Sequence, residues 1–228
     1  MVDSGGGAGG HRREVRAVVF DLDGVIVDSF EVMREAFSIA YDEVVGVGEA
    51  PFDEYNRHLG RYFPDIMRIM GLPPALEEPF VRESYRLAPL VQVFPGIPEL
   101  LGELRCRGLP LAVATGKAGE RARALLDQLG LLGMFDVVIG SDEVARPKPA
   151  PDMVELAVSV LGARPEETVM LGDAVTDLHS ARGAGVAAAA ALWAGIDPAP
   201  LLREFPDFVL HSPADLLDLV AEPVAATP

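Results

Sequence analysis

The stretch Val18-Val19-Phe20-Asp21-Leu22-Asp23-Gly24 decides the fold that we expect for this chain of 228 residues. Three apolar residues run directly into two carboxylates, and alternation along a strand would point Asp21 and Asp23 the same way. Carboxylates are poor strand formers, and two at one spot repel, which a cation or a shared proton relieves. One could be a nucleophile or metal ligand while the other handles a proton. Taken alone, the stretch could also be a strand and an acidic turn, because Asp and Gly favour turns.

A second apolar run, residues 109–114, stops at Thr115-Gly116 and leads at once into a helix-like stretch. A hydroxyl and free backbone N–H groups at the start of a helix make an anion-binding site. The competing interpretation of Thr115 is that it only caps the helix.

A proline-rich loop follows, Arg146-Pro147-Lys148-Pro149-Ala150-Pro151-Asp152. Prolines at alternate positions hold this loop extended and leave Lys148 in a stiff frame. The chain has only two lysines, Lys117 and Lys148, against seventeen arginines. Lys148 is therefore a candidate point charge for a phosphate, and the alternative is a solvated loop lysine.

The apolar run 168–171 ends in Gly172-Asp173-Ala174-Val175-Thr176-Asp177. Asp173 is expected at a helix N-cap and Asp177 one turn further on, so both could face one point. Together with the carboxylates of the first strand, they would make an all-oxygen site suited to Mg²⁺. Either aspartate alone could instead be a cap or a first-turn charge favoured by the helix dipole.

The pattern along the chain predicts an α/β fold, a Rossmann-like three-layer core with a parallel sheet plus an inserted α-helical cap. Predicted strands lie at 15–20, 109–114, 136–139, 168–171, 186–190 and 208–210, and predicted helices at 98–107, 118–129, 151–161, 175–183 and 213–220. Residues 31–45, 52–59, 63–70 and 76–87 also have helix-like apolar spacing. We therefore expect a disordered tail at 1–13, a core formed by 14–30 and 96–228, and a cap at 31–95. The polar stretches would then lie at the carboxyl ends of parallel strands, where open sheets bind ligands.

Four stretches, in order, resemble the motifs of the haloacid dehalogenase-like (HAD) hydrolases over about residues 15 to 220. They are residues 21–29, 114–116, 148–149 and 172–177. The resemblance is greatest to the branch that contains phosphoglycolate phosphatases and β-phosphoglucomutases. One departure is Ala174, where relatives often have a hydroxyl residue, and it loses a hydrogen bond but no charged group.

This resemblance implies hydrolysis of a phosphate ester with Mg²⁺ as the cofactor. Asp21 would attack the phosphoryl group to give an aspartyl-phosphate, and Asp23 would act as the acid and then the base. Thr115 and Gly116 would hold phosphoryl oxygens, and Lys148 would neutralise developing charge. The implied metal site comprises Asp21, the backbone carbonyl of Asp23, Asp173 and Asp177. Of these, Asp177 would orient a metal-bound water or Lys148.

The cap is expected to choose the substrate by closing over the site. Leu59-Gly60-Arg61 resembles a lid segment that touches substrate in related enzymes. Arg61 could clamp a second anionic group or a sugar hydroxyl, or it could be a surface arginine. Phosphoglycolate is the default substrate of this branch. Residues 63–67 also resemble phosphatases associated with 3-amino-5-hydroxybenzoate formation in ansamycin antibiotic pathways, which would make the substrate a sugar or amino-sugar phosphate.

Other activities within the superfamily make different demands on the sequence. A β-phosphoglucomutase-like enzyme would keep all four motifs and return the phosphoryl group to the sugar, and only cap details would distinguish it. Haloacid dehalogenases lack an acidic residue at position 23, and imine-forming phosphonate hydrolases need a cap lysine, which residues 31–95 do not contain. A non-catalytic binding protein would usually have lost a motif residue, and here all are present.

Composition limits the binding partners and the cellular compartment that we expect for this chain. The net charge of −16 argues against a nucleic-acid partner, so the expected partner is a small phosphorylated metabolite. The sequence contains neither an apolar run long enough for a membrane span nor an N-terminal signal segment. The single Cys106 cannot form an internal disulfide, which fits a reducing cytoplasm. The default expectation is a cytoplasmic monomer, although the sequence does not indicate the oligomeric state.

Overall fold

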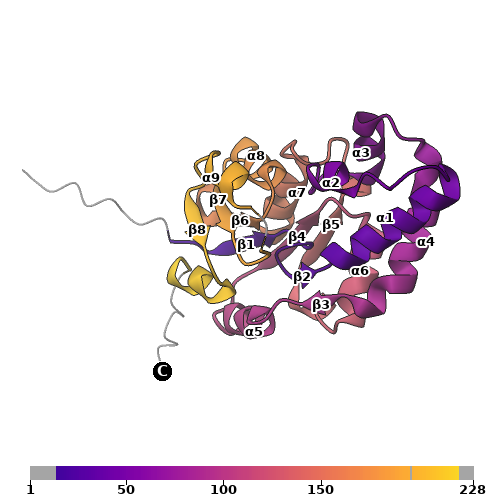
Figure 1. Ribbon diagram of the computed structural model, residues 1–228. Coiled ribbons are helices and arrows are strands. Elements are labelled where there is room, and N and C mark those ends of the chain that lie inside the picture. The colour runs from indigo at the N-terminus through magenta and orange to yellow at the C-terminus, as the bar shows by residue number, and fades with distance from the viewer. Residues whose placement is uncertain (1–13, 196, 221–228) are drawn as a thin grey trace, which may run out of the picture.

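A six-stranded sheet forms the centre of the computed structural model, which describes residues 14–195 and 197–220 (Figure 1). The predicted tail at 1–13 lies outside these residues. All neighbouring strands are parallel, in the order β5-β4-β1-β6-β7-β8. The strands are β1 (Ala17–Phe20), β4 (Leu111–Thr115), β5 (Val137–Gly140), β6 (Thr168–Gly172), β7 (Ala187–Ala191) and β8 (Phe208–Leu210). The chain winds outward from β1 in both directions, as in Rossmann-like folds, which confirms the predicted fold class.

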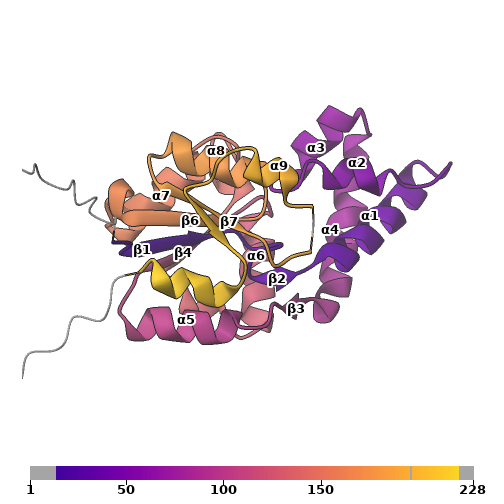
Figure 2. The same cartoon turned by 60° about the vertical axis from the view of Figure 1, so that its left-hand side comes forward.

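Helices cover both faces of the sheet, because the strand side chains are buried on both sides. In β1, Val18 and Phe20 enter one apolar core and Val19 enters the other. The first core is closed by α5 (Ile97–Cys106) and α6 (Gly119–Gln128), and the second by α7 (Asp152–Leu161) and α8 (Val175–Gly183). Figure 2 shows α7 and α8 above the sheet and α5 below it.

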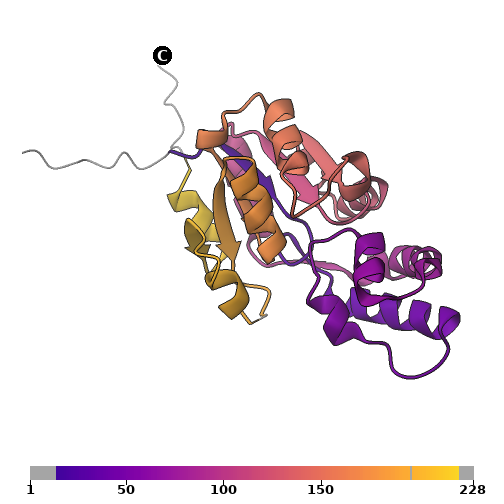
Figure 3. The same ribbon diagram turned by 90° about the horizontal axis from the view of Figure 1, so that it is seen from above.

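Between β1 and α5 the chain forms a separate group of helices with its own apolar core. They are α1 (Phe30–Val44), α2 (Phe52–Asn56), α3 (Phe63–Met70) and α4 (Glu77–Leu87), with short 3₁₀ turns at Pro74–Leu76 and Ala88–Leu90. Aromatic rings fill this core, and Phe63 stacks on Phe80 with 4.1 Å between ring centroids. Figures 2 and 3 show the group beyond the end of the sheet toward which β1 runs. This helical segment therefore faces the carboxyl ends of the strands.

Several elements differ from the predictions. A two-stranded antiparallel ribbon, β2 (Val27–Asp28) with β3 (Gln92–Val93), connects the helical segment to the sheet. Neither this ribbon nor α9 (Ala199–Leu202) was predicted, because segments of two to four residues are too short to show a period. The predicted helix 213–220 is a 3₁₀ helix over Pro213–Asp218. The first strand begins at Ala17 rather than at residue 15.

Within the described residues, every helix is too short or too polar to cross a membrane. Cys106, the last residue of α5, is a free and exposed thiol.

Candidate active site

The carboxyl ends of β1, β4 and β6 meet at the point where the winding of the sheet reverses. The Asp21 N–H continues the pairing beyond β1 and donates to the Leu171 carbonyl of β6 at 2.8 Å. Thr115 is the last residue of β4, and Asp173 follows directly after β6. Ligands of open parallel sheets bind at this edge, so the chain concentrates its reactive groups where a crevice forms.

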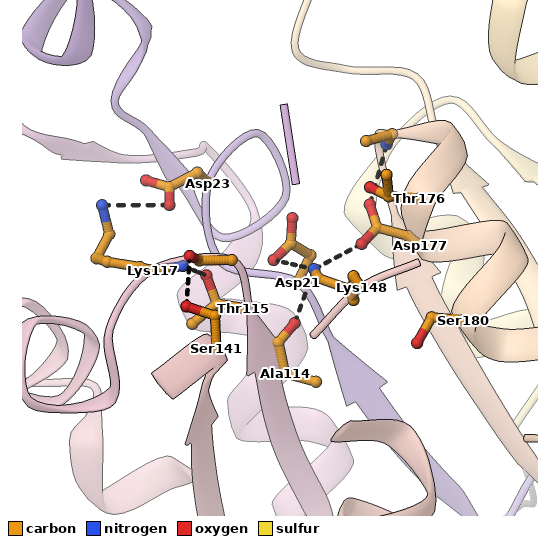
Figure 4. Close-up of polar contacts among 12 residues, drawn as sticks. Asp21, Asp23, Ala114, Thr115, Lys117, Ser141, Lys148, Thr176, Asp177 and Ser180 are labelled. Carbon is orange, nitrogen blue, oxygen red and sulfur yellow. Dashed lines mark hydrogen bonds and ion pairs between the residues drawn. The ribbon is translucent and has the colours of Figure 1, made fainter. Parts of the chain in front are cut away.

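Lys148 is buried at the centre of this edge, with no exposed side-chain surface. Its Nζ lies 2.9 Å from Asp21 Oδ1, 2.6 Å from Asp177 Oδ1 and 3.0 Å from the Ala114 carbonyl oxygen (Figure 4). The Ser180 hydroxyl donates to the Ala150 carbonyl at 2.7 Å and so ties the proline-rich loop to α8. Lys148 is therefore not a solvated loop lysine, and it joins groups from three parts of the sheet edge.

Burial and charge set the ionisation of this cluster. Burial disfavours the Lys148 ammonium, but Asp177 and Asp21 outweigh that penalty and raise the pKa of Lys148. Burial raises the pKa of Asp21 to about 7, and repulsion from Asp177 and Asp23 adds to the rise against the opposing charge of Lys148. Burial and repulsion from Asp21 and Asp177 raise the pKa of Asp173 well above its usual range. Three carboxylates thus share one ammonium, and the excess negative charge is held at an energetic cost.

Asp21, Asp173 and Asp177 each offer a carboxylate oxygen, and these oxygens lie within 4.8 Å of one another. Hard oxygen donors with excess negative charge fit Mg²⁺. Gly24 gives Asp173 its space: a Cβ there would lie 1.9 Å from Asp173 Oδ2, and the φ of +81° also favours glycine. The donor set therefore fits the cofactor that the sequence predicts.

The N-cap of α8 is Ala174, so the predicted placement of Asp173 at the cap is wrong. Asp177 Oδ2 accepts the Ala174 N–H at 3.0 Å, while its Oδ1 binds Lys148. The capping role thus falls to Asp177, which leaves the Asp173 carboxylate turned toward the cluster.

The Asp23 carboxylate lies apart from this cluster but lines the same cavity as Asp21. The Ser29 hydroxyl donates to its Oδ1 at 2.6 Å, and the Lys117 Nζ lies 3.3 Å from its Oδ2. Burial would raise the pKa of Asp23, but the charge of Lys117 and the Ser29 hydrogen bond outweigh it and lower that pKa. Burial in turn lowers the pKa of Lys117, against the attraction of Asp23. Any metal contact from Asp23 would have to come from its backbone carbonyl, as the resemblance implies.

Thr115 and Gly116 lie on the floor of the cavity between Asp21 and Lys117. The N-cap of α6 is Ala118, three residues beyond Thr115, so Thr115 does not cap that helix. Its Oγ1 instead accepts the Lys117 N–H at 3.2 Å. The Ser141 hydroxyl donates to the Gly116 carbonyl at 2.8 Å and fixes the orientation of that peptide.

The loop Leu59-Gly60-Arg61 of the helical segment packs directly onto this floor. The Thr176 hydroxyl donates to the Leu59 carbonyl at 3.3 Å. A Cβ on Gly116 would lie 2.7 Å from the Gly60 carbonyl oxygen and 2.8 Å from that of Arg61. The side of the cavity opposite the floor is largely apolar, and Arg61 also lines the cavity. Its apolar lining residues include Phe30, Met33, Phe63, Ile66, Phe80 and Phe94.

Polar residues without an individual role predicted from the sequence also line the cavity, among them Ser29, Tyr55, Lys117 and Arg121. Ser29 lies within the predicted motif 21–29, and the position of Lys117 directly after Thr115-Gly116 is a usable signal. Arg121 lies in the first turn of α6, four residues after Lys117, which precedes the helix. Tyr55 has no comparable signal, because its place in the cavity depends on how the helical segment packs.

Comparison with known proteins gives consistent results. A family model described as haloacid dehalogenase-like hydrolase matches residues 15–185. The chain is 32% identical to a phosphoglycolate phosphatase of Aquifex aeolicus, covering 90% of this chain and 97% of that protein. It is 33% identical to the pyrophosphatase PpaX of Halalkalibacterium halodurans, covering 91% of this chain and 97% of that protein. A solved structure of a hydrolase from Pseudomonas syringae has a TM-score of 0.77 at 26% identity, covering 89% and 96% of the two chains.

Replacement of Lys148 by methionine should destabilise the protein strongly. Lys148→Met leaves Asp21 and Asp177 buried without their cation, and breaking such a buried pair costs about 3–5 kcal/mol. We expect this loss in the free energy of urea unfolding, measured in EDTA at neutral pH. Arg146→Met is the matched control in the same loop, since its ion pair with Asp152 is exposed and should matter little. Equal stability of the two variants would contradict the importance of the Lys148 contacts.

Replacement of Gly116 by alanine should displace the loop that packs on it. The added Cβ collides with the backbone of Gly60 and Arg61, and overpacking of this kind costs about 1–3 kcal/mol. Hydrogen–deuterium exchange in residues 57–63 should therefore become faster, roughly tenfold or more. Gly102→Ala on α5 is the control, because a Cβ there meets nothing within 4 Å. Unchanged exchange in Gly116→Ala would show that the contact does not hold the loop.

Proposed function

The chain belongs to the haloacid dehalogenase-like hydrolase family, and we propose that it is a Mg²⁺-dependent phosphatase acting through an aspartyl-phosphate on Asp21. The observation that carries this proposal is the environment of Asp21. Lys148 holds one oxygen of this carboxylate, while the other accepts no hydrogen bond from a described residue, and the side chain lines the cavity. A carboxylate fixed by one oxygen and open at the other is suited to attack a phosphorus atom placed in the cavity.

Asp21, Asp173 and Asp177 would hold the Mg²⁺, together with the backbone carbonyl of Asp23. When bound, the ion would supply positive charge that neutralises phosphoryl oxygens and brings a dianionic ester close to a carboxylate. Asp177 would act mainly through Lys148, because one of its oxygens binds that ammonium and the other binds the Ala174 N–H.

The two steps need one nucleophile and one group that moves a proton. In the first step an Asp21 oxygen bonds to phosphorus, the ester P–O bond breaks, and Asp23 gives a proton to the leaving oxygen. In the second step Asp23 takes a proton from water, whose oxygen attacks phosphorus and releases Asp21 and phosphate. The lowered pKa of Asp23 keeps it ionised in the free protein. An incoming dianion would compete for Lys117 and raise the pKa of Asp23, which prepares it as the acid.

The remaining residues of the floor would bind the phosphoryl group. The Thr115 hydroxyl and the Gly116 N–H are free to donate to phosphoryl oxygens, since the Thr115 oxygen is used only as an acceptor by Lys117. Lys148 would balance the charge that shifts between Asp21 and the phosphoryl oxygens. These groups are in place before substrate arrives, so little reorganisation is needed.

We propose that residues 31–95 act as a lid that excludes water during the reaction. The contact of Gly60 and Arg61 with Gly116, and of Leu59 with Thr176, would represent its closed position. The β2–β3 ribbon, through which the chain enters and leaves the helical segment, would be the hinge. Closure removes water that would otherwise compete with Asp23 and weaken electrostatic interactions in the cavity.

The substrate would be a small phosphorylated metabolite. The relatives are named for phosphoglycolate and for pyrophosphate, and these names support a compact substrate. A lining that is part charged and part apolar fits a ligand of that size. The ansamycin association remains a prediction from residues 63–67 alone, without support from these relatives.

Phosphate release should require both Asp21 and Mg²⁺. We expect Asp21→Asn to lower kcat for release from phosphoglycolate, pyrophosphate or a hexose phosphate by roughly 10³-fold or more. Chelation with EDTA should abolish the release, and added Mg²⁺ should restore it. Acid quench of wild type with ³²P-labelled substrate should trap label on Asp21, identified by peptide mapping. Interconversion of sugar phosphate isomers without net phosphate release would favour a mutase instead.

Binding of Mg²⁺ should stabilise the protein more at high pH than at low pH. Because the pKa of Asp21 is raised to about 7, its contribution to stability in EDTA is present below about pH 4 and is lost as pH rises through 7. Mg²⁺ needs the ionised carboxylates, so its stabilisation should be larger at pH 8 than at pH 5.5. At a hundredfold excess over Kd it is about 2.7 kcal/mol. Melting temperatures with and without Mg²⁺ measure this effect, and Asp173→Asn should reduce it. An equal shift at both pH values would contradict the expected charge coupling.

A further inference from the structure

Two polar side chains beside Asp23 have no role in the proposed reaction. Arg121 lies in the first turn of α6, and Tyr55 lies on α2 of the helical segment. Both line the same cavity as Asp23 and Lys117. The leaving group of a substrate bound at Asp21 must extend toward Asp23, which protonates it, so it must enter this part of the cavity.

Arg121 makes no ion pair or hydrogen bond with any described residue, and its Nε is buried without a partner. The guanidinium carbon lies 5.4 Å from the centre of the Phe80 ring, which supports one face of the group but satisfies none of its donors. The chain has 35 acidic residues against 19 lysines and arginines, so an arginine has many acids available to pair with. A buried donor without a partner is costly and is commonly explained by a ligand.

Tyr55 lines the same cavity as Arg121. Its ring stacks on Phe37 with 4.7 Å between centroids, and only 4% of the residue is exposed. The hydroxyl makes no hydrogen bond to a described residue, and buried tyrosine hydroxyls usually find one. Burial raises the pKa of Tyr55, with the charge of Arg121 opposing the rise, so the group stays protonated and can donate.

We propose that Arg121 and Tyr55 form a second anion subsite, which binds a carboxylate or phosphoryl group on the leaving group of the substrate. This inference rests on the proposed phosphatase function and specifies its substrate class. The planar guanidinium can bind a carboxylate or phosphoryl group through two hydrogen bonds, and Tyr55 can add a third from the opposite wall. A small ester or anhydride with an anionic leaving group would fill both unmet donors. A neutral leaving group would leave the Arg121 Nε buried and unpaired.

Matched substrates test the subsite. 2-Phosphoglycolate and 2-hydroxyethyl phosphate differ in whether the leaving group ends in a carboxylate, and pyrophosphate and methyl phosphate form the phosphoryl pair. We expect Arg121→Met and Tyr55→Phe to lower kcat/KM for the anionic member of a pair by roughly 10- to 100-fold, mainly through KM. The neutral member should change by less than about threefold. Comparing each variant with wild type on the same substrate cancels intrinsic reactivity, and the two pairs separate a carboxylate from a phosphoryl ligand.

Arg123→Met is the control on the same helix, because Arg123 pairs with Glu143 outside the cavity. It should leave kcat/KM unchanged on all four substrates. An equal loss on both members of each pair in Arg121→Met would indicate a structural role and overturn the inference. Arg61→Met could instead lose the preference for the anionic substrate of each pair while Arg121→Met behaves as wild type. That result would place the subsite at Arg61 and also overturn the inference.

Calorimetric titration separates failure of the subsite from failure of the proposed function. Phosphonoacetate carries a phosphoryl-like group and a carboxylate, whereas ethylphosphonate lacks the carboxylate, and neither is hydrolysed. Wild type should bind phosphonoacetate more tightly by roughly tenfold or more, and Arg121→Met should lose that difference. Hydrolysis of none of the four substrates, and of no hexose phosphate either, would refute the proposed function, while the titration would still test the subsite. Equal binding of the two phosphonates by wild type would refute the subsite alone.

Discussion

The buried ammonium of Lys148 holds the catalytic edge of the sheet together. It has three N–H donors and three acceptors within 3.0 Å: Asp21, Asp177 and the Ala114 carbonyl. Removing a charge from water is costly, so this lysine is tolerated only because its partners satisfy it completely. The same lysine cannot neutralise Asp21, Asp173 and Asp177 at once. Burial, with the residual negative charge adding to it, raises the pKa of Asp21 and Asp173. This excess of buried carboxylates makes the site suited to a divalent cation.

This cluster depends on the topology of the sheet. Asp21, Ala114 and Asp177 are far apart in the sequence and come together only because β1 lies between β4 and β6 with all three parallel. The backbone must also allow the side chains to approach. Gly24 leaves room for Asp173, and Gly116 leaves room for the loop at Gly60. The reactive groups are thus held by strand ends and close backbone contacts, which favours a preorganised site.

Local signals account for what the sequence predicted. Carboxylates and a hydroxyl at or soon after the ends of apolar runs singled out Asp21, Thr115 and Asp177, and the proline-rich loop singled out Lys148. The alternating strand and helix pattern predicted the fold. Contacts between distant segments account for what it missed. Tyr55 reaches the cavity only through the packing of the helical segment. The β2–β3 ribbon pairs two residues before that segment with two residues after its last helix. The cap of α8 was assigned to Asp173 because sequence alone cannot fix a helix start to within one residue.

Charge is distributed unevenly along the cavity, and this asymmetry connects the chemistry to the choice of substrate. On one side, three aspartates surround a single ammonium, so that side attracts a cation. On the other side, Lys117 and Arg121 both lower the pKa of Asp23, so the two cations there outnumber that carboxylate. In the proposed reaction a phosphate ester would span the two sides, with its phosphoryl group near the first and its leaving group near the second. Asp21, Lys148, Asp173 and Asp177, which come from three of the four motifs, lie on the first side and can be common to enzymes with different substrates. Arg121 and Tyr55 come from α6 and the helical segment, so substitutions there can change the leaving group that is accepted without disturbing the groups that act on phosphorus.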